Sequence, residues 1–380
     1  SLVGSEMCIR DSMNVVQIVS HFDLGGAERI AINIAKSKES DINYHMIEVV
    51  RGSSNFSRDY MKELETAGIK YYRSPFTNSK MGIVFFPIRL IALIKKVCPI
   101  AIHTHTEIPD LSLYWTCLLL PRIMQDIKIV RTLHNTVLWN KWKSIGRVVE
   151  KFMQKRKANI STSDMITCTY QKEFGFDSNI KLIYNGFTAI SQQAYPYIYS
   201  GKINVLFAGR FVPQKGIPVL INIIKRVDEK VFYFHIAGKG PLEEIILQEL
   251  GNKSNVRITP PIFSLAQYLS SFDYVFIPSE HEGLNSLSIE SSINKVPVII
   301  NDIDGLNETL PQNYPLKVKN NCIDEYMTLF TDVIPTIDRV SLIDSVYQYS
   351  CQKFDIQQMQ KQYEYIYKTG KKYGCCYREK

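Results

Sequence analysis

Short apolar runs alternate with helical patterns along most of the chain, and this alternation constrains the fold more than any other feature. The first series of runs starts at 14–20 (NVVQIVS) and the second at 204–211 (NVLFAGRF). Strands separated by helices form parallel sheets, because a parallel neighbour needs a long crossover connection that a helix supplies. Two such series predict two doubly wound α/β domains. The other predicted strands are 44–50, 69–75, 100–107, 127–135 and 180–186 in the first series and 231–240, 255–260, 274–280 and 297–303 in the second.

The domain boundaries follow from where this rhythm stops. The stretch 186–202 has neither a strand nor a helix period. We therefore predict a first Rossmann-like domain, a linker, a second domain and a helical tail at 13–187, 188–202, 203–355 and 356–380. The opening SLVGSEMCIRDS has neither the apolar core of a signal peptide nor any period, and we interpret residues 1–12 as a non-native leader before Met13.

Composition excludes several other classes of protein. A chain of 380 residues with 45% hydrophobic and 22% charged residues is typical of folded domains with full cores. Its eight cysteines form no CxxC pair or cysteine–histidine cluster, which predicts reduced thiols in a cytoplasmic protein. The apolar stretches 82–94 and 111–121 are too short or too broken to predict a membrane span. The net charge is +8, but no RNA- or DNA-binding motif accompanies it, so nucleic acid is not an expected partner.

A basic segment from Trp139 to Lys157 contains one acid, Glu150, and two tryptophans. One interpretation is a solvated helix face, with the tryptophans in the core. The other is a helix over 144–157 that lies on an anionic membrane surface, with Trp139 and Trp142 beside it, which would place the protein at the inner face of the plasma membrane. The basic residues are Lys141, Lys143, Arg147, Lys151, Lys155, Arg156 and Lys157.

Polar and glycine-rich clusters follow the predicted strands, where open parallel sheets bind ligands. These clusters converge only if the two domains face each other across a cleft. In the first series they contain Gly25 and Gly26, then His103, His105 and Glu107, then His134 and Asn135. In the second series they are GRFVPQKG (209–216), GKGP (238–241) and EGLNS (282–286).

The second series offers an anion site. Arg210 and Lys215 lie on a strand-to-helix loop, where two cations and free backbone N–H groups bind a diphosphate. Gly283 allows a ligand to approach the backbone closely, and a helix that starts near Ser286 turns its positive end toward the same place. The alternative is that Arg210 and Lys215 are ordinary surface charges.

Two carboxylates flank that site. Glu290 lies one turn into the helix, where it can accept hydrogen bonds from a ribose diol, and Glu282 can reach the hydroxyls of a sugar beyond the phosphates. This combination predicts a nucleoside diphosphate sugar as ligand. Gly25 and Gly26 form no dinucleotide fingerprint, because GxGxxG is absent, and a mere tight turn remains an alternative for them.

The stretch EGLNSLSIE (282–290) resembles the E-x7-E motif of the retaining glycosyltransferases of family 4, which have the GT-B fold of two facing Rossmann-like domains. Further motifs of this family follow in the expected order from Met13 to about Gly370. They are GGAER (25–29), PIAIHTH (99–105), TLHN (132–135), IYNG (183–186), GRFVPQKG (209–216) and AGKGP (237–241).

The resemblance implies a role for each matching residue. Arg210 and Lys215 would neutralise the diphosphate, Glu290 would bind the ribose and Glu282 the donor sugar, while His134 would contact that sugar from the other domain. The remaining implied binding residues are Gly25 and Gly26, which would admit the phosphate and acceptor, and His105, Gly209, Gly238, Gly283, Leu284, Asn285 and Ser286.

The resemblance also implies a reaction. A hexose or N-acetylhexosamine would pass from a nucleoside diphosphate sugar, with uridine diphosphate as the first expectation, to a glycan acceptor. The expected acceptor is lipid-linked, as in capsule or exopolysaccharide synthesis in bacteria. No cofactor and no divalent metal are expected, because the cations would take the role of the metal.

Three positions depart from the family pattern. Asn285 replaces a glycine or proline, Ile100 replaces an aspartate, and Asp304 replaces the first of two glycines. Two rivals share the ligand: a sugar-nucleotide 2-epimerase of the same fold, and a catalytically idle nucleotide-sugar-binding protein. A nicotinamide dehydrogenase fits the strand rhythm but lacks the fingerprint.

Overall fold

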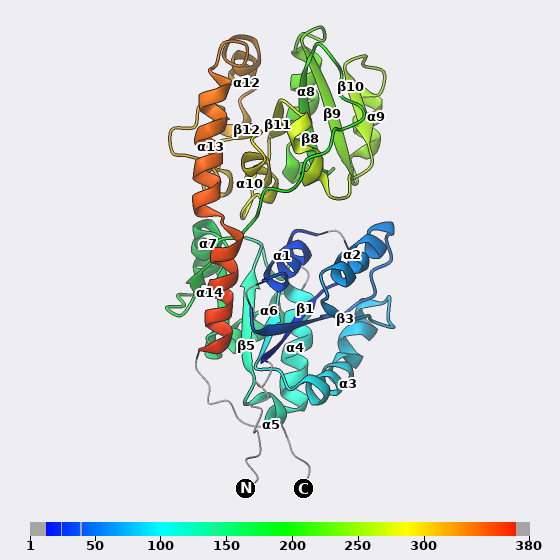
Figure 1. Cartoon of the computed structure of the whole chain (residues 1–380), viewed down its shortest axis with the longest axis vertical. Coiled ribbons are helices and arrows are strands. Elements are labelled where there is room, and N and C mark those ends of the chain that lie inside the picture. Colours follow the sequence, from blue (N-terminus) through cyan, green and yellow to red (C-terminus); the bar gives the residue numbers. More distant parts are fainter. Residues whose placement is uncertain (1–12, 24, 39, 141, 370–380) are drawn as a thin grey trace, which may run out of the picture.

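The structure, a computed structural model, describes residues 13–369 except 24, 39 and 141. The predicted leader and the last part of the predicted tail lie outside the described residues. The described chain forms two α/β lobes stacked along the long axis of the molecule, each built on one parallel sheet (Figure 1). Two doubly wound parallel sheets confirm the predicted fold class.

The first sheet has the strand order β3-β2-β1-β4-β5-β6-β7, with every neighbouring pair parallel. One apolar cluster packs α1 and α2 against it, and a second cluster packs α3, α4, α6 and α7. Its strands are β1 Met13–Val19, β2 Ile42–Glu48, β3 Lys70–Tyr72, β4 Ala101–Thr104, β5 Lys128–Leu133, β6 Asn159–Ser161 and β7 Lys181–Leu182. Its helices are α1 Gly26–Ala35, α2 Asn55–Thr66, α3 Ser79–Val97, α4 Glu107–Leu119, α5 Pro121–Met124, α6 Lys143–Lys155 and α7 Asp164–Phe174.

The second sheet is also parallel, in the order β10-β9-β8-β11-β12-β13. Its strands and the helices of the second lobe pack together in one large apolar cluster. Its strands are β8 Ile203–Arg210, β9 Phe232–Lys239, β10 Val256–Thr259, β11 Tyr274–Ile277, β12 Val298–Asn301 and β13 Lys317–Val318. Its helices are α8 Ile217–Arg226, α9 Glu243–Leu250, α10 Ser286–Ile293, α11 Asp304–Asn307, α12 Ile323–Thr328 and α13 Arg339–Lys353.

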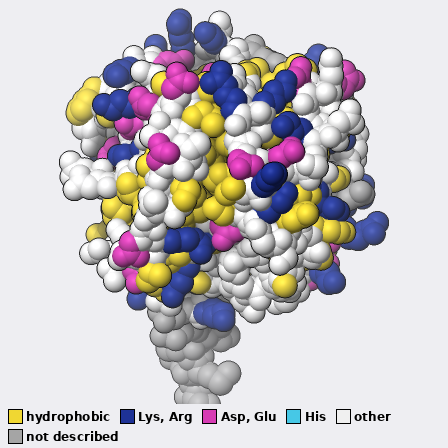
Figure 2. All heavy atoms as spheres, turned by 90° about the horizontal axis from the view of Figure 1, so that it is seen from above, with side chains coloured by type: hydrophobic (Ala, Val, Ile, Leu, Met, Phe, Trp, Pro, Cys, Tyr) yellow, Lys and Arg dark blue, Asp and Glu magenta, His cyan; other side chains and the backbone are white. Residues whose placement is uncertain are grey.

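The outer end of the second lobe carries both signs of charge. Seen from that end, lysines and arginines alternate with acids around exposed apolar side chains (Figure 2). Among the ion pairs of the second lobe, Lys225 of α8 pairs with Glu249 of α9. This face therefore has no field of a single sign.

The last helix returns to the first lobe. α13 and α14 (Ile356–Lys368) follow one another along one side of the molecule (Figure 1). The apolar face of α14 is buried in the cluster that also contains β1 and α1. An isolated parallel bridge joins Phe187 to Asp355, so the two chain crossings between the lobes lie side by side.

Both sheets reverse their strand order beside the first strand, between β1 and β4 and between β8 and β11. Ligands of open α/β sheets bind in the crevice that forms at this reversal, beyond the carboxyl ends of the strands. The clusters predicted from the sequence follow β1, β4, β5, β8, β9 and β11. The topology therefore directs these clusters toward the space between the lobes.

Trp139 corrects one part of the membrane interpretation. The prediction that it lies at the surface beside the basic helix is wrong, because only 3% of Trp139 is exposed. Its indole Nε1 donates a hydrogen bond to Glu150 Oε1 at 2.5 Å, and its ring packs over Gly146 of α6. Trp142 remains exposed, and Lys141 lies outside the described residues.

Glu150 belongs to a buried charge network beneath α6. Arg131 of β5 donates to both carboxylate oxygens of Glu150, at 2.5 and 2.7 Å, and to Asp110 of α4 at 2.7 Å. Tyr170 donates to Glu150 as well, at 2.8 Å. The network ties α4, α6 and α7 to the sheet.

Within the described residues, no helix combines the length and apolarity that crossing a bilayer requires.

Candidate functional site

The loop after β8 is packed tightly against the chain that follows β11. A short turn at Pro213–Lys215 leads to Gly216, whose φ of 69° lies in the left-handed region that favours glycine. A Cβ at Gly216 would stand 1.9 Å from the carbonyl oxygen of Pro278. This contact brings Lys215 to the loop that carries Glu282.

Lys215 and Glu282 form an ion pair in the structure. Lys215 Nζ lies 2.6 Å from Glu282 Oε1, and the two side chains are 20% and 10% exposed. Both residues line a hollow of about 220 Å³ between the ends of β8 and β11. The sequence-predicted residues Leu284, Asn285 and Ser286 line the same hollow.

α10 begins at the rim of this hollow. Asn285 is its N-cap, and the side-chain oxygen accepts a hydrogen bond from Ser288 N at 2.9 Å. Asparagine is among the best N-caps, which explains its presence where the family pattern has glycine or proline.

Glu290 lies one turn into α10, as predicted. The residue as a whole is half-buried, but desolvation of its carboxyl raises the pKa of Glu290 to about 7, while the positive charge of Arg29 opposes this rise. Arg29 belongs to α1 of the first lobe, so the two lobes meet at this carboxyl. Ile289 and Ile293 of α10 accordingly join the apolar cluster around β1 and α1.

His134 meets the second lobe through its backbone. A Cβ on Gly283 would lie 3.1 Å from the His134 carbonyl oxygen and 3.0 Å from Ile166 of α7. Ser163 Oγ, at the start of α7, donates to the Gly283 carbonyl oxygen at 2.8 Å. A side chain at Gly283 would therefore push against the first lobe, which is a physical reason for glycine at this position.

Three histidines of the first lobe, His103, His105 and His134, form a neutral group. His105 Nδ1 lies 3.3 Å from His134 Nε2, and the rings of His103 and His105 are 4.0 Å apart. Burial lowers the pKa of His134 to about 3 and holds the pKa values of His103 and His105 well below the usual range. All three rings are uncharged near neutral pH.

The structure leaves some predicted residues outside the hollow. Arg210 is exposed at the end of β8 and does not line it, while Gly209 pairs with Gly238 in the adjacent strand β9. Gly25 caps α1, where a Cβ would stand 2.1 Å from Glu28 Oε2, and Gly26 has open space around it.

Three residues near the site were missed by sequence reasoning. Lys239 of β9 pairs with Arg210 of β8 and adds a cation at the same edge of the sheet. Its position within the motif AGKGP could have identified it from the sequence. Burial raises the pKa of Glu28 to about 7, and its signal was its position after the glycine pair. Gln17, a fully buried amide, was visible as a polar residue inside the first apolar run.

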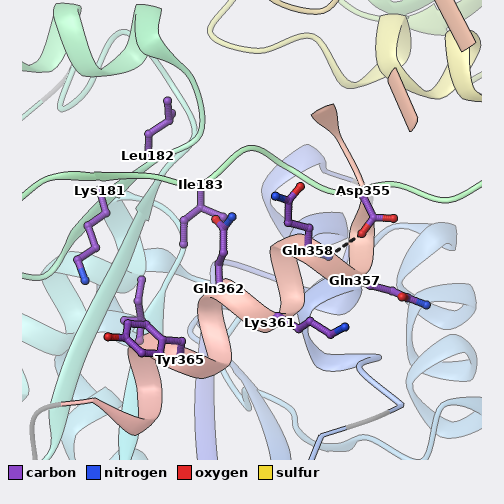
Figure 3. Close-up of a pocket in the computed structure, with 10 residues that line it drawn as sticks. Lys181, Leu182, Ile183, Asp355, Gln357, Gln358, Lys361, Gln362 and Tyr365 are labelled. Carbon is purple, nitrogen blue, oxygen red and sulfur yellow. Dashed lines mark hydrogen bonds between the residues drawn. The ribbon is translucent and has the colours of Figure 1, made fainter. Parts of the chain in front are cut away.

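A second hollow, of about 600 Å³, lies away from these residues. It is lined by residues of β7 and α14 and by Ile183 and Asp355 beside them, and Ile183 and Gln362 point toward one another (Figure 3). It contains none of the predicted site residues. Among the described residues, no group of three or more His, Cys, Asp or Glu side chains is placed to hold a metal ion.

Two family models match the chain, one over each lobe. The model described as Glycosyltransferase Family 4 matches residues 24–189, and the model described as Glycosyl transferases group 1 matches residues 202–329. Both models describe glycosyltransferases, and the model over the first lobe is that of the family whose motifs the sequence resembles.

The chain is similar to several proteins of bacteria and archaea, one of which is named for O-antigen biosynthesis. The O-antigen biosynthesis glycosyltransferase WbnH of Escherichia coli is 22% identical over 308 residues, which span 79% of this chain and 84% of that protein. A 41.2 kDa protein of the cps region of Klebsiella pneumoniae is 28% identical over 45% of this chain and 50% of its own length. The glycosyltransferase MJ1178 of Methanocaldococcus jannaschii is 31% identical over 42% and 47%. The chain spans about half the length of the latter two relatives.

Solved structures show the same architecture. HepE of Anabaena, in complex with UDP-glucose, superposes with a TM-score of 0.76 at 17% identity over 93% of this chain and 99% of that one. TarM of S. aureus, solved with UDP and other ligands, gives a TM-score of 0.74 at 14% identity over 94% and 100%. These likenesses confirm the GT-B fold.

Proposed function

We propose that this protein transfers a hexose or N-acetylhexosamine from a nucleoside diphosphate sugar to a glycan acceptor in surface polysaccharide biosynthesis. The proposed donor is a uridine diphosphate sugar, the acceptor is lipid-linked, and the anomeric configuration is retained. The observation that carries the proposal is the hollow between β8 and β11, where Lys215 and Glu282 meet at the start of α10. UDP-glucose in HepE and the O-antigen role in the name of WbnH support the donor and the pathway class.

The charges of the hollow suit the departure of a diphosphate. As the bond to the anomeric carbon breaks, negative charge develops on the leaving oxygen, and Lys215 together with the N-terminus of α10 stabilises that charge. Glu282, released from Lys215, then accepts hydrogen bonds from hydroxyls of the sugar. On this mechanism the departing diphosphate takes the acceptor's proton, so no side chain has to serve as general base.

Incubation with uridine diphosphate sugars tests the proposal. Nucleotide release that depends on an added lipid-linked glycan, with a product whose anomeric configuration matches the donor, is the expected result. A 2-epimerase would instead convert the sugar without acceptor, and an idle binding protein would bind donor without releasing nucleotide. Either result would contradict the proposal.

Glu290 makes donor use depend on pH. Its free-enzyme pKa of about 7 means that much of the carboxyl is protonated below pH 7. The carboxylate accepts more hydrogen bonds from a diol than the acid does, so kcat/KM for the donor should rise as pH increases through about 7 and level off above it. Glu290→Gln should abolish this rise, which a pH profile of kcat/KM measures. An equal rise in wild type and Glu290→Gln would assign the titration to another group.

Metal removal should have little effect. Lys215, Arg210 and the α10 N-terminus supply positive charge for the diphosphate without a metal. Turnover in excess EDTA should therefore stay close to the untreated rate. Loss of activity in EDTA, restored by Mn²⁺ or Mg²⁺, would contradict this account of the phosphate site.

The helical face of the first lobe supplies the surface for a membrane-bound acceptor. Ile145 and Val148 of α6 are each 49% exposed, and Leu118 of α4 is 53% exposed. The rings of Tyr114 and Phe152, 5.3 Å apart, connect the two helices. Beside this apolar surface the side chains of Arg147, Lys151 and Lys155 are exposed, without an ion pair among the described residues. An apolar strip flanked by cations suits the headgroup region of an anionic bilayer.

We expect reversible binding to anionic vesicles. Each exposed cation near such a surface is worth about 1 kcal/mol, and the attraction fades within about 10 Å at 0.1 M salt. Replacement of Arg147, Lys151 and Lys155 by glutamine should therefore reduce pelleting with phosphatidylglycerol vesicles, and salt should reduce it in the wild type.

The matched control is replacement of Lys225, Arg226 and Lys230, three exposed cations of the second lobe, by glutamine. This control should pellet like the wild type. If the wild type pelleted equally with neutral and with anionic vesicles, or did not pellet at low salt, the membrane proposal would be contradicted. The solvated helix face would then be the correct interpretation of α6.

A further inference from the structure

A buried chain of polar side chains runs from β1 to His134. Gln17 of β1 is fully buried, and its Oε1 lies 2.8 Å from His105 Nε2. The other nitrogen of His105, Nδ1, lies 3.3 Å from His134 Nε2, and the two rings are stacked with centroids 5.5 Å apart. Only His134, at the end of this chain, keeps part of its surface exposed.

The positions of the protons along this chain follow from its first member. The Gln17 amide is turned with its oxygen toward His105, which leaves its buried Nε2 without a hydrogen-bond partner among the described residues. An amide oxygen only accepts, so in this orientation His105 Nε2 carries the proton of the Gln17–His105 hydrogen bond. The ring is neutral, which leaves His105 Nδ1 as an acceptor. The proton between the two histidines therefore belongs to His134 Nε2, and the remaining nitrogen of His134, Nδ1, holds a lone pair.

The neighbouring side chains do not change the positions of these protons. His103 stacks on His105, but its own nitrogens are engaged by Thr132 and Tyr367, each at 2.7 Å. Thr132 in turn contacts Tyr363 of α14 at 2.8 Å. His103 thus belongs to a separate set of hydrogen bonds and exchanges no proton with the Gln17 chain. Among the described residues, His134 Nδ1 has no hydrogen-bond partner.

We propose that Gln17 and His105 are positioning residues that fix His134 in the tautomer whose free nitrogen, Nδ1, accepts a hydrogen bond. The ligand group that this nitrogen recognises is a hydrogen-bond donor such as a hydroxyl, not a carbonyl or an ionised phosphate oxygen, because only a donor can pair with a lone pair. That the hydroxyl belongs to the transferred sugar rests on the proposed function. The tautomer itself does not, since it follows from the protein alone.

The tautomer can be measured without substrate. In protein labelled with ¹⁵N-histidine, long-range ¹H–¹⁵N correlation spectra distinguish a protonated Nε2 from a protonated Nδ1, and the His134→Asn spectrum identifies the signals of His134. We expect both His105 and His134 to carry the proton on Nε2. Gln17→Met removes the accepting oxygen with little change of shape, and it should turn the His134 signals into those of a mixture of tautomers.

A second variant and a control complete the experiment. His105→Phe preserves the stacking but removes the acceptor of His134, so it should release the His134 tautomer in the same way. Tyr363→Phe removes a buried hydroxyl from the neighbouring set and should leave the His134 signals unchanged. Either a wild-type His134 protonated on Nδ1, or unchanged His134 signals in both Gln17→Met and His105→Phe, would overturn the proposal.

Activity gives an independent second readout. In an active preparation, Gln17→Met should lower kcat/KM for the donor by about tenfold, the size of effect expected for one lost hydrogen bond. Tyr363→Phe should stay within about twofold of the wild type. If no sugar transfer is found at all, the proposed function fails while the spectra still decide the tautomer.

Discussion

Replacement of Lys215 by alanine should lower turnover by about 10²–10³, the cost of losing one preorganised charge donor at a leaving group. The variant also leaves Glu282 without the cation that lies 2.6 Å from it, so the negative diphosphate would enter a hollow with an unpaired acid. Steady-state release of nucleotide from a uridine diphosphate sugar, at saturating donor and acceptor, measures the loss. Arg210→Ala should fall in the same range if the exposed Arg210 folds onto the bound diphosphate.

Lys225→Ala is the matched control, because Lys225 pairs with an acid on the surface of the same lobe. Its turnover should equal that of the wild type. The double variant Lys215→Ala/Glu282→Gln separates the two parts of the effect, since it removes the cation without leaving an unpaired carboxylate. Near-normal turnover in both Lys215→Ala and Arg210→Ala would contradict the phosphate site.

Replacement of Arg131 by methionine should destabilise the first lobe by about 3–5 kcal/mol, because breaking a buried ion network leaves the remaining charges uncompensated. Arg131 is 1% exposed and binds both Glu150 and Asp110. All three tryptophans of the chain lie in this lobe, at 115, 139 and 142. Tryptophan fluorescence during urea unfolding therefore reports on the lobe that carries the change.

Arg147→Met provides the comparison, since it makes the same substitution on the exposed side of α6. It should change the free energy of unfolding by no more than about 0.5 kcal/mol. A loss below about 1 kcal/mol in Arg131→Met would mean that water or backbone groups replace the guanidinium easily.

The fold could be predicted because its signal is local and repeated. Apolar runs such as 14–20 and 204–211 coincide closely with β1 and β8, and alternation with helices is enough to specify parallel sheets. Two strands escaped this reasoning. β6 reads Asn159-Ile160-Ser161 and β13 has two residues, so neither is long enough to show a period. The domain boundaries and the roles of the site residues stay predictions.

The candidate site could be predicted only in part, because a sequence shows which residues follow strands but not which ones touch. The hollow brings Glu282, Leu284, Asn285 and Ser286 together with Lys215. The Lys215–Glu282 ion pair joins residues 67 positions apart in the sequence, and no local sequence pattern predicts it. Trp139 was misjudged for the same reason, since its partner Glu150 is held by Arg131 of a distant strand.

The return of α14 to the first lobe has a mechanical consequence for how the molecule can move. The chain passes between the lobes at Phe187 and again at Asp355, and Phe187 N donates to the carbonyl oxygen of Phe354 at 2.9 Å. Two crossing segments that are hydrogen-bonded to each other resist a twist of one lobe against the other. They allow the lobes to rotate about a hinge axis that runs through the two segments. Opening to admit a donor or release a nucleotide should therefore be a rotation about that axis, which separates Gly283 from His134 while the tied segments at Phe187 and Asp355 stay together.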